Sequence, residues 1–331
     1  MAYLDGKQVL VTGGTGSFGS TIVERLLRET DCRKIIIFSR DEAKQYFMRD
    51  RFRGETQLEF RIGDVRDLRS VERACEGVDA VFHAAALKQV PSCEEYPLEA
   101  VKTNILGAQN VIDAAHSQGV ERILAISTDK AVKPVNAMGL SKAMQEKLFI
   151  AANHGSNSRF SCVRYGNVLN SRGSIIPLFL DQLNRQKDLT LTDERMTRFI
   201  LTLKKATDLV LHVIEEMRGG EIFIPRIPAL LVKDLAEVIL GQAKSSGNGH
   251  RRIRCIGIRP GEKIHETLVS EDEVRRCVES NETFVILPNE NRIREVPPDF
   301  HPKGPGEFRS DSCPRLNPRE IQELLASEAP E

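Results

Sequence analysis

An acidic and a basic residue, Asp129 and Lys130, follow closely after the apolar run at residues 123–126. Such a run predicts a buried strand, so both charged side chains leave the sheet at the strand's carboxyl end. A carboxyl group and an amine held side by side in a cleft can donate and accept protons, which is the chemistry of a general acid–base pair. The alternative is a solvated turn pair, which a position at a strand end disfavours.

The same stretch, residues 127–142, adds a hydroxyl and a second lysine. It reads STDKAVKPVNAMGLSK and closes inside an amphipathic helix. Lys142 follows Met138 by four residues, one helical turn, so the two share a face. We therefore expect Thr128 and Lys142 to act beside the acid–base pair, with Met138 at a position that carries no proton, because a thioether is a weak acceptor.

A glycine-rich stretch near the N-terminus predicts a nucleotide site. Residues 8–12 predict a strand, and GGTGSFG follows at residues 13–19 before an amphipathic helix. These glycines satisfy both the G-x-G-x-x-G and the G-x-x-G-x-x-G spacing. Glycine lets the backbone approach a pyrophosphate, whose charge the helix N-terminus meets, whereas a plain tight turn is the alternative. The cofactor contacts expected here are Gly13, Thr15, Gly16, Ser17, Phe18 and Gly19.

The end of the second predicted strand, residues 34–38, indicates which dinucleotide binds. Ser39 and Arg40 stand at the strand end, and Lys44 follows one helical turn later. A hydroxyl and two cations suit a 2′-phosphate, because a guanidinium makes charge-assisted contacts with phosphate oxygens. We therefore expect NADP rather than NAD. Asp41 carries the competing interpretation, as a helix cap or as the partner of a ribose hydroxyl.

Polar and small residues also follow the third and fourth predicted strands, residues 58–62 and 80–83. Asp64 can accept from an adenine amino group, although a turn or N-cap is an equal alternative. Three consecutive alanines after the fourth strand leave room for the ribose and the nicotinamide. The cofactor contacts expected at these two strand ends are Asp64, Val65, Ala84, Ala85, Ala86 and Lys88. His83 is expected to pack near the sheet end and not to act as a base.

A long helix is expected at residues 97–116, with a polar break around Asn104. In a helix that otherwise packs on the sheet, this amide can bridge backbone groups beneath the active site. A position on the surface is the alternative.

Strands and helices alternate five times, and each strand is a near-continuous apolar run. This pattern is typical of a parallel sheet covered on both faces. We therefore predict an α/β fold, a Rossmann-type doubly wound parallel sheet with a smaller mixed α/β lobe and a C-terminal extension. Its ligands bind at the carboxyl ends of the strands, where all the polar clusters above fall.

The expected domains are residues 1–166 for NADP binding, with 200–224 packing back on them, 167–199 and 225–290 for the substrate lobe, and 291–331 for the extension. In the lobe, Arg172, Arg198 and Arg259 stand among apolar or Gly/Pro residues, which suits anion clamps facing one cleft. A solvated surface position is the alternative for each. Residues 244–250, KSSGNGH, predict a surface loop.

The composition argues against several functions. The 331 residues include 47 Lys and Arg and 47 Asp and Glu, and this zero net charge gives no support for nucleic-acid binding. No apolar run is long enough to span a membrane, and the first strand begins too early for a signal peptide, so we expect a cytoplasmic protein. Seven scattered cysteines without zinc spacing indicate free thiols and no metal site.

Taken together, the motifs resemble those of the inverting UDP-N-acetylglucosamine 4,6-dehydratases, extended members of the short-chain dehydrogenase/reductase family, over roughly residues 5–290. The motifs are TGGTGSFG (12–19), FSRDE (38–42), GDVRD (63–67), HAAALKQVP (83–91), KTNI (102–105), STDKA (127–131), RYGNV (164–168), SRGSIIP (171–177), MTRF (196–199) and RPGEKIHE (259–266). The stretch around Met138 is most like the capsule and O-antigen branch, which carries methionine where short-chain enzymes otherwise have the tyrosine of Tyr-x-x-x-Lys.

The resemblance implies tightly bound NADP, UDP-N-acetylglucosamine as substrate, and a cytoplasmic homo-oligomer, often a hexamer, to whose contacts the C-terminal extension contributes. The further cofactor residues that it implies are Lys88, Asn104, Lys142, Tyr165 and Asn167. The substrate residues that it implies are Lys88, Asn167, Arg172, Ser174, Thr192, Arg198, Arg259 and Glu262.

The reaction of that family oxidises C4, removes water across C5 and C6, and reduces C6. Oxidation at C4 acidifies the C5 proton, so Lys130 can take it, provided that burial or a cation such as Lys142 lowers its pKa. Asp129 can protonate the departing C6 hydroxyl if desolvation keeps it neutral, and Thr128 can bond to the C4 oxygen. Lys130 or Lys142 must replace the missing tyrosine as acceptor of the C4 hydroxyl proton, and Met138→Tyr is expected to be tolerated.

Two other functions remain open. A UDP-sugar C4 epimerase uses the same cofactor and the same oxidation, but it has no need of an acid–base pair that reaches C5 and C6. A non-catalytic NADP-binding regulator would explain the missing tyrosine as a dead site. Charges gathered in a cleft are costly without a task, which argues against the regulator.

Overall fold

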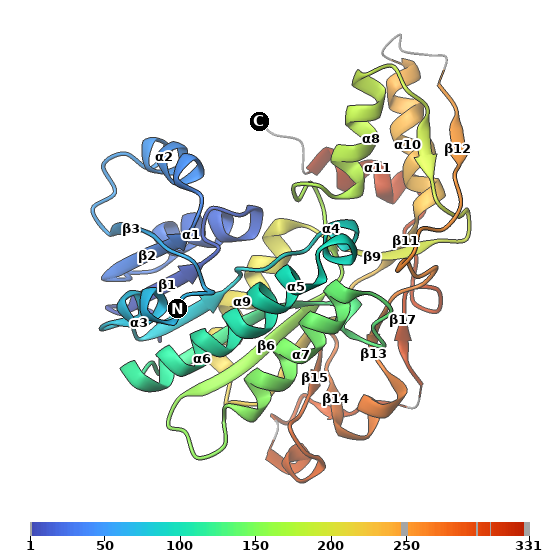
Figure 1. Ribbon diagram of the computed structural model, residues 1–331. Helices are drawn as coiled ribbons and strands as arrows, with labels where there is room; N and C mark the ends of the chain where they lie inside the picture. The colour runs from blue at the N-terminus through green and yellow to red at the C-terminus, as the bar shows by residue number, and fades with distance from the viewer. Residues whose placement is uncertain (1, 246–250, 296, 305, 328–331) are drawn as a thin grey trace.

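The computed structural model describes residues 2–245, 251–295, 297–304 and 306–327. Within them, the main feature is a ten-stranded sheet in the order β16-β14-β15-β10-β6-β5-β4-β1-β2-β3 (Figure 1). Its strands are β1 (Gln8–Thr12), β2 (Lys34–Ser39), β3 (Leu58–Ile62), β4 (Ala80–His83), β5 (Arg122–Thr128), β6 (Arg159–Tyr165), β10 (Ile222–Pro225), β14 (Cys277–Glu279), β15 (Thr283–Ile286) and β16 (His301–Pro302). The strands from β10 to β3 are parallel neighbours, which confirms the predicted doubly wound α/β fold.

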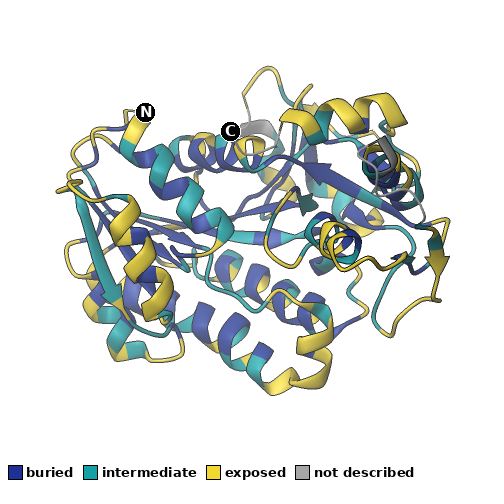
Figure 2. Ribbon diagram, turned by 90° about the horizontal axis from the view of Figure 1, so that it is seen from above, coloured by how far each residue is buried: buried dark blue, intermediate teal, exposed yellow. Residues whose placement is uncertain are grey.

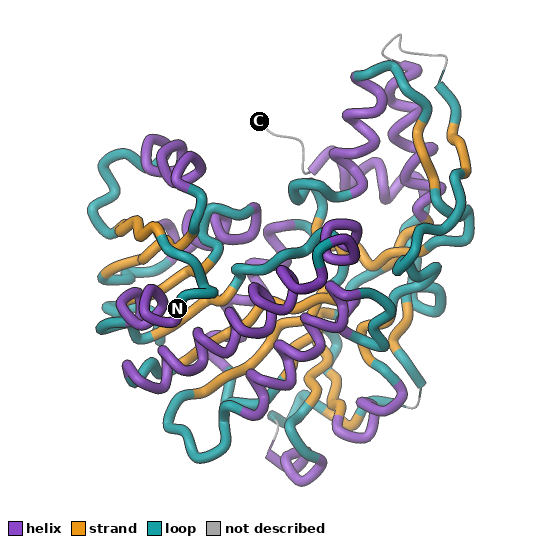
Figure 3. The backbone as a smooth tube through the Cα atoms, viewed as in Figure 1, coloured by secondary structure: helices purple, strands orange, loops and turns teal. Residues whose placement is uncertain are grey.

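Helices cover both faces of this sheet (Figures 1 and 3). On one face α1 (Ser17–Glu29) packs beside α9 (Leu203–Glu216), and on the other α6 (Gly107–Gln118) lies between α3 (Leu68–Cys75) and α7 (Ala137–Ala151). All five residues of β1 are buried. Figure 2 shows that buried residues gather in the interior of the molecule. Apolar residues on both faces of a strand require two covering layers, and this is why the apolar runs predicted these strands well.

The long helix expected at residues 97–116 is not regular throughout. It consists of α5 (Pro97–Ala100), a π-helical segment η1 (Val101–Leu106) and α6. A π-helix fits an extra residue into a turn, and such segments are frequent near functional sites. The segment carries Asn104, which is fully buried.

A second lobe stands beside the sheet and has its own apolar core. Its elements are β7 (Asn167–Val168), α8 (Ile175–Asn184), β8 (Leu189–Leu191), β9 (Thr197–Leu201), β11 (Ala229–Leu231), α10 (Val232–Ser245), β12 (Ile253–Cys255) and α11 (Pro318–Ser327). Phe179 of α8, Leu235 of α10 and Ile321 of α11 meet in that core. The lobe is therefore built from two separate stretches of the chain and closed by a helix from its C-terminal part.

The structure adds detail to the expected division of the chain. Within the range 225–290 expected for the lobe, β14 and β15 extend the central sheet, where β15 pairs antiparallel with β10. The C-terminal extension packs on its own chain through α11 and through β17 (Phe308–Arg309), which pairs with β13 (Thr267–Val269). Of the loop expected at 244–250, the first two residues end α10 and 246–250 lie outside the described residues.

Three properties of the described residues bear on the kind of protein. No helix among them is both long enough and apolar enough to cross a membrane. The seven cysteines, all in the described part of the chain, are free thiols, as predicted. The described residues contain no cluster of His, Cys, Asp and Glu able to hold a metal ion.

Candidate active site

The glycine-rich loop between β1 and α1 packs so closely against the segment after β4 that a side chain at residue 13 would collide with it. Gly13 has a φ of +65°, and a Cβ on it would lie 2.8 Å from the backbone nitrogen of Ala85. A Cβ on Gly19 would collide with the backbone of Gly13. Only glycine fits these two positions, and the close packing brings the N-terminus of α1 to the strand ends, where this type of fold holds a pyrophosphate.

A cavity of about 280 Å³ lies at the carboxyl ends of β1 to β4. Its lining consists of Gly13, Thr15, Gly16, Phe38, Ser39, Arg40, Asp41, Lys44, Gly63, Asp64, Val65, Ala84, Ala85, Ala86 and Thr103. Most of the expected cofactor contacts thus come together. The expected contacts Ser17, Phe18 and Gly19 form the first turn of α1. Ser39 is buried, and its hydroxyl accepts a hydrogen bond from Gln45 at 3.1 Å.

The end of β2 places cations and carboxylates together in this cavity. A guanidinium nitrogen of Arg40 lies 3.7 Å from Asp64 Oδ2. Lys44 pairs with Asp41, and Asp41 caps α2 (Glu42–Arg51) by accepting a hydrogen bond from the Lys44 backbone N–H at 3.0 Å. These bonds from Lys44 lower the pKa of Asp41 below its ordinary value. The helix cap, one of the two interpretations left open for Asp41, is therefore formed.

Asn104 bridges backbone groups below the alanine segment, as predicted. Its Oδ1 accepts from the Leu87 N–H at 2.8 Å, and its Nδ2 donates to the Leu87 carbonyl and to Ser141 Oγ, both at 2.9 Å. The bridge joins the loop after β4 to α7. Lys88, the next residue of that loop, is exposed.

His83 is part of the core and not a candidate base. Its ring stacks on Phe149, and its Nδ1 lies 2.8 Å from Thr12 Oγ1. Burial lowers its pKa to about 3, so the ring is neutral at physiological pH. This confirms the structural role predicted for it.

Lys142 and Met138 share one face of α7 but lie in different surroundings. Lys142 Nζ donates to the Ile126 carbonyl at 2.6 Å and to Gln145 Oε1 at 2.7 Å. Burial lowers the pKa of Lys142 to about 8. Met138 is buried in a small apolar cluster with Cys93, where it fills space between helices.

The acid–base pair sits on a single 3-10 turn, η2 (Asp129–Ala131), which joins the end of β5 to the start of α7. Asp129 is fully buried, and its Oδ1 accepts from the Thr128 hydroxyl at 2.9 Å and from Lys130 Nζ at 3.0 Å. Its Oδ2 has no hydrogen-bond partner within the described residues. A buried carboxylate oxygen without a donor is costly, so Asp129 Oδ2 has room to accept one further hydrogen bond.

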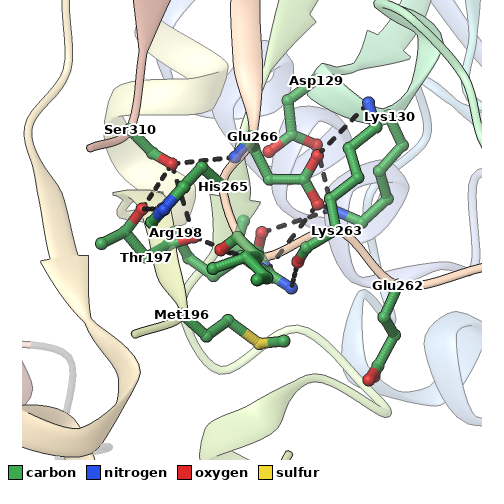
Figure 4. Close-up of polar contacts among 12 residues, drawn as sticks. Asp129, Lys130, Met196, Thr197, Arg198, Glu262, Lys263, His265, Glu266 and Ser310 are labelled. Atoms are coloured by element: carbon green, nitrogen blue, oxygen red, sulfur yellow. Dashed lines mark hydrogen bonds and ion pairs between the residues drawn. The ribbon is translucent and has the colours of Figure 1, made fainter. Parts of the chain in front are cut away.

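Lys130 lies between two carboxylates (Figure 4). Its Nζ is 3.0 Å from Asp129 Oδ1, 3.5 Å from Glu266 Oε1 and 3.5 Å from Asn167 Oδ1. Burial lowers the pKa of Lys130, but the carboxylates of Asp129 and Glu266 outweigh burial and raise it above the ordinary value. The expectation that burial or Lys142 would lower this pKa is therefore wrong, and Lys130 is an ammonium group in the resting protein.

Arg198 holds a loop of the second lobe in place. Its guanidinium donates to the backbone carbonyls of Thr197, Lys263 and Ile264 at 2.7 to 3.1 Å. With these bonds it braces residues 263–266 against β9, so most of its donors are used within the protein. The sequence predicted that Arg198 clamps an anion. That role needs guanidinium donors that face a ligand, whereas these donate to backbone carbonyls.

The other two arginines lie at separate places. The backbone N–H of Arg172 donates to Ser17 Oγ at 3.2 Å, which brings this loop of the second lobe to the start of α1. Arg259 is half exposed, with a guanidinium nitrogen 3.9 Å from Glu262 Oε1. Glu262 itself points away from the Lys130 group in Figure 4.

The remaining expected ligands are distributed around the acid–base pair and the second lobe. Tyr165 is buried at the end of β6, in register with Thr128, and burial raises its pKa. Ser174 precedes α8, and its buried hydroxyl has no partner among the residues described. The buried hydroxyl of Thr192 donates to the sulfur of Met196 at 3.3 Å.

Two charged residues of the site, Lys263 and Glu266, were not expected from the sequence. They belong to the RPGEKIHE motif, from which only Arg259 and Glu262 were selected. Glu266 is 2% exposed and immediately precedes β13, and its Oε2 lies 3.8 Å from Lys263 Nζ. The strand-end reasoning that identified Asp129 and Lys130 applies to the carboxyl ends of strands, and Glu266 lies at the amino end of a short strand, so the sequence held no such signal for it.

Fold and site together define a doubly wound α/β protein in which a glycine-rich cleft and a buried aspartate–lysine pair lie at the ends of neighbouring strands. Residues 9–288 match a protein family described as "polysaccharide biosynthesis protein". The chain is a member of that family.

The relatives and solved structures that are similar to this chain are named for different reactions. A "UDP-glucose 4-epimerase" of Rickettsia bellii is 45% identical over 333 aligned residues, which cover 96% of this chain and 95% of that protein. The structure of Pen from Bacillus thuringiensis has a TM-score of 0.92 at 36% identity, with 99% of both chains covered. DesIV, a dTDP-glucose 4,6-dehydratase from Streptomyces venezuelae with NAD and TYD bound, shares the fold with a TM-score of 0.71 at 24% identity, over 78% of this chain and 86% of that one.

Proposed function

We propose that this protein is an NADP-dependent UDP-N-acetylglucosamine 4,6-dehydratase that inverts C5, a lyase that acts in surface-polysaccharide synthesis. Its product would be UDP-2-acetamido-2,6-dideoxy-L-arabino-hex-4-ulose. The observation that carries the proposal is the Asp129–Lys130 pair, buried at a strand end, with one carboxylate oxygen left without a donor. Elimination of water needs such a pair, whereas oxidation at C4 alone does not.

The residues of the nucleotide cleft fit NADP. Gly13 leaves a cradle that a Cβ would fill, and Arg40 and Lys44 stand in the same cavity with Ser39, where a 2′-phosphate would need them. When bound, the nicotinamide supplies reversible oxidation at C4 of the sugar. Lys142 is held beside β5 by its bond to the Ile126 carbonyl, where it would orient the nicotinamide ribose.

One proton transfer from Lys130 to Asp129 would produce both the base and the acid that the elimination needs. Lys130 Nζ and Asp129 Oδ1 are 3.0 Å apart, so the ammonium proton can move to the carboxylate, breaking an N–H bond and forming an O–H bond. The products are a neutral amine, able to take the C5 proton, and a carboxylic acid, able to protonate the C6 hydroxyl. A bound sugar that excludes water favours the neutral pair, because burial disfavours both charges.

Thr128 gives the C4 hydroxyl proton a route that does not use Met138. The Thr128 hydroxyl donates to Asp129 Oδ1 at 2.9 Å, but that carboxylate takes up the Lys130 proton and has no place for a second one. The C4 hydroxyl proton would therefore go to Lys142, directly or through Thr128, because the pKa of Lys142 is lowered to about 8. Met138 lies in an apolar cluster and takes no part in this relay.

The second candidate is a UDP-sugar 4-epimerase, which the names of the Rickettsia relatives favour. Incubation with UDP-N-acetylglucosamine and, separately, with UDP-glucose distinguishes the two reactions by product mass. The dehydratase forms a 4-keto product that has lost one water, whereas the epimerase forms an isomer of unchanged mass. Bound NADP without any conversion of either sugar would leave the regulator as the remaining candidate.

A further inference from the structure

Glu266 brings a second buried carboxylate to the acid–base pair from the opposite side. Its Oε1 lies 3.5 Å from Lys130 Nζ and 3.9 Å from Arg198 Nε, and its Oε2 lies 3.8 Å from Lys263 Nζ. Oε2 has no hydrogen-bond donor within the described residues. An interior carboxylate that forms ion pairs with three cations, while one of its oxygens has no hydrogen bond, is unusual for a purely structural residue.

The C-terminal part of the chain anchors this glutamate. The Glu266 N–H donates to Ser310 Oγ at 2.9 Å, and the Ser310 N–H donates to the Glu266 carbonyl at 2.9 Å. Ser310 is fully buried, and its hydroxyl lies 2.7 Å from Thr197 Oγ1 in β9 (Figure 4). The glutamate backbone is therefore held from two elements, which leaves its carboxylate little freedom to leave Lys130.

The groups that face Lys130 come from four elements. Asp129 on η2 and Glu266 before β13 are negative, while Arg198 on β9 and Lys263 in the preceding loop are positive. Asn167 on β7 is neutral and accepts from Nζ at 3.5 Å. The two carboxylates lie closest to Nζ, so they determine the sign of the field at the amine.

We propose that Glu266 is a positioning residue that holds the Lys130 amine beside Asp129 and controls when that amine becomes a base. This role deepens the proposed dehydration and rests on it, because it acts through Lys130. The raised pKa of Lys130 agrees in direction: burial lowers it, and Asp129 and then Glu266 raise it further. Removal of the Glu266 charge should therefore lower the pKa of Lys130.

The test measures the titration of Lys130 itself. Wild type and Glu266→Gln are labelled briefly with acetic anhydride between about pH 8 and 11, and the Lys130 peptide is quantified by mass spectrometry against exposed Lys204. Acetic anhydride reacts with the neutral amine, so the pH profile of the labelling rate follows the neutral fraction and reports the pKa; because the pKa of wild-type Lys130 is raised, its rate should still be rising at the upper end of this range. We expect the Lys130 curve of Glu266→Gln to move to lower pH by roughly one to two units.

Two pairs of variants make this test specific. Glu271→Gln removes an equal charge from an exposed position nearby and should leave the Lys130 curve unchanged. Ser310→Ala keeps the Glu266 charge but removes its anchor, so it should shift the curve in the same direction by less, whereas exposed Ser312→Ala should not. If Glu266→Gln does not fold, the comparison of Ser310→Ala with Ser312→Ala tests the inference instead.

An unchanged Lys130 curve in folded Glu266→Gln, or in Ser310→Ala if the glutamine variant is unfolded, overturns the inference. The same preparations are then assayed for loss of water from UDP-N-acetylglucosamine. If the Lys130 curve shifts but no protein dehydrates this sugar, the role of Glu266 stands and the proposed dehydration fails. The two conclusions are therefore tested separately.

Discussion

At the scale of single residues, the site depends on Asp129, a buried carboxylate that is only half satisfied. One of its oxygens receives two hydrogen bonds and the other none within the described residues. A folded protein retains such an atom only where the rest of the structure compensates for the cost. The unpaired oxygen is thus the best indication of where a substrate hydroxyl would bind.

Asp129→Asn is expected to lower the rate of dehydration by about a hundred- to ten-thousandfold, because an amide keeps the shape but cannot donate the proton of an acid. Product is measured as loss of one water by mass spectrometry. Binding of NADP should be unchanged, since Asp129 lies outside the nucleotide cavity. Full activity in the asparagine variant would remove Asp129 from the mechanism.

Lys142 should make the stability of the protein depend on pH. Its pKa in the folded protein is about 8, below the ordinary 10.5, so the folded state binds fewer protons between these values and stability rises with pH. Relative to Lys142→Met, the free energy of unfolding of the wild type should rise by about 3 kcal/mol across that interval. Urea unfolding at several pH values measures this, with exposed Lys147→Met as control. A difference that does not vary with pH would contradict it.

Met138→Tyr was expected to be tolerated, but the packing changes this prediction. Met138 is 4% exposed and packs in the cluster of Cys93 and Ala100, where a ring needs more room. Overpacking of this kind costs about 1 to 3 kcal/mol, which denaturant unfolding would detect as a lower midpoint. A variant as stable as the wild type would show that the ring leaves the cluster.

At the scale of elements, the turn η2 rests directly on the start of α7. A Cβ on Gly139 would collide with the carbonyl oxygen of Lys130, so the turn can sit there only because residue 139 is glycine. The collision is with backbone, which cannot move aside as the end of a side chain can. The position of the acid–base pair therefore depends on a residue that carries no chemistry.

Gly139→Ala should displace η2 and reduce dehydration strongly while lowering stability by about 1 to 3 kcal/mol. Gly241→Ala in α10 is the matched control, because a Cβ there meets nothing within 4 Å. Replacing glycine inside a helix at such an open position should stabilise by about 0.5 to 1 kcal/mol. Activity assays and thermal unfolding compare the two, and equal effects would refute the collision.

The sequence predicted those elements whose signals are local. Strand ends such as Thr12 and His83 matched, because buried parallel strands are apolar runs with polar ends. The π-helical segment was missed, since a helix with one extra residue has nearly the same apolar pattern. Glu266 was missed because its place beside Lys130 depends on tertiary pairing with Ser310.

At the scale of the whole molecule, one outer face carries exposed apolar residues on adjacent helices. Leu98 on α5, Leu106 on η1, and Leu140 and Met144 on α7 are between 47% and 61% exposed. Isolated exposed apolar residues are ordinary, but several on neighbouring helices mark an interaction surface. This supports the proposal of a homo-oligomer.

Leu140→Lys combined with Met144→Lys should therefore convert the oligomer to a monomer of 37.1 kDa, because two buried charges would oppose association. Light scattering after gel filtration measures the mass. Leu180→Lys, a similarly exposed leucine on α8, is the control and should leave the mass unchanged. If the wild-type protein is itself a monomer, the proposal of a homo-oligomer is wrong.

The hydrogen bond between Thr197 and Ser310 joins two residues that the ribosome adds at different times. The two residues are 113 positions apart, so at about 5 to 20 residues per second a ribosome adds Ser310 roughly 6 to 23 s after Thr197. The lining of the nucleotide cavity, by contrast, is complete once Thr103 has been made. All the residues that line the nucleotide cavity are therefore synthesised well before Ser310, the residue that anchors Glu266.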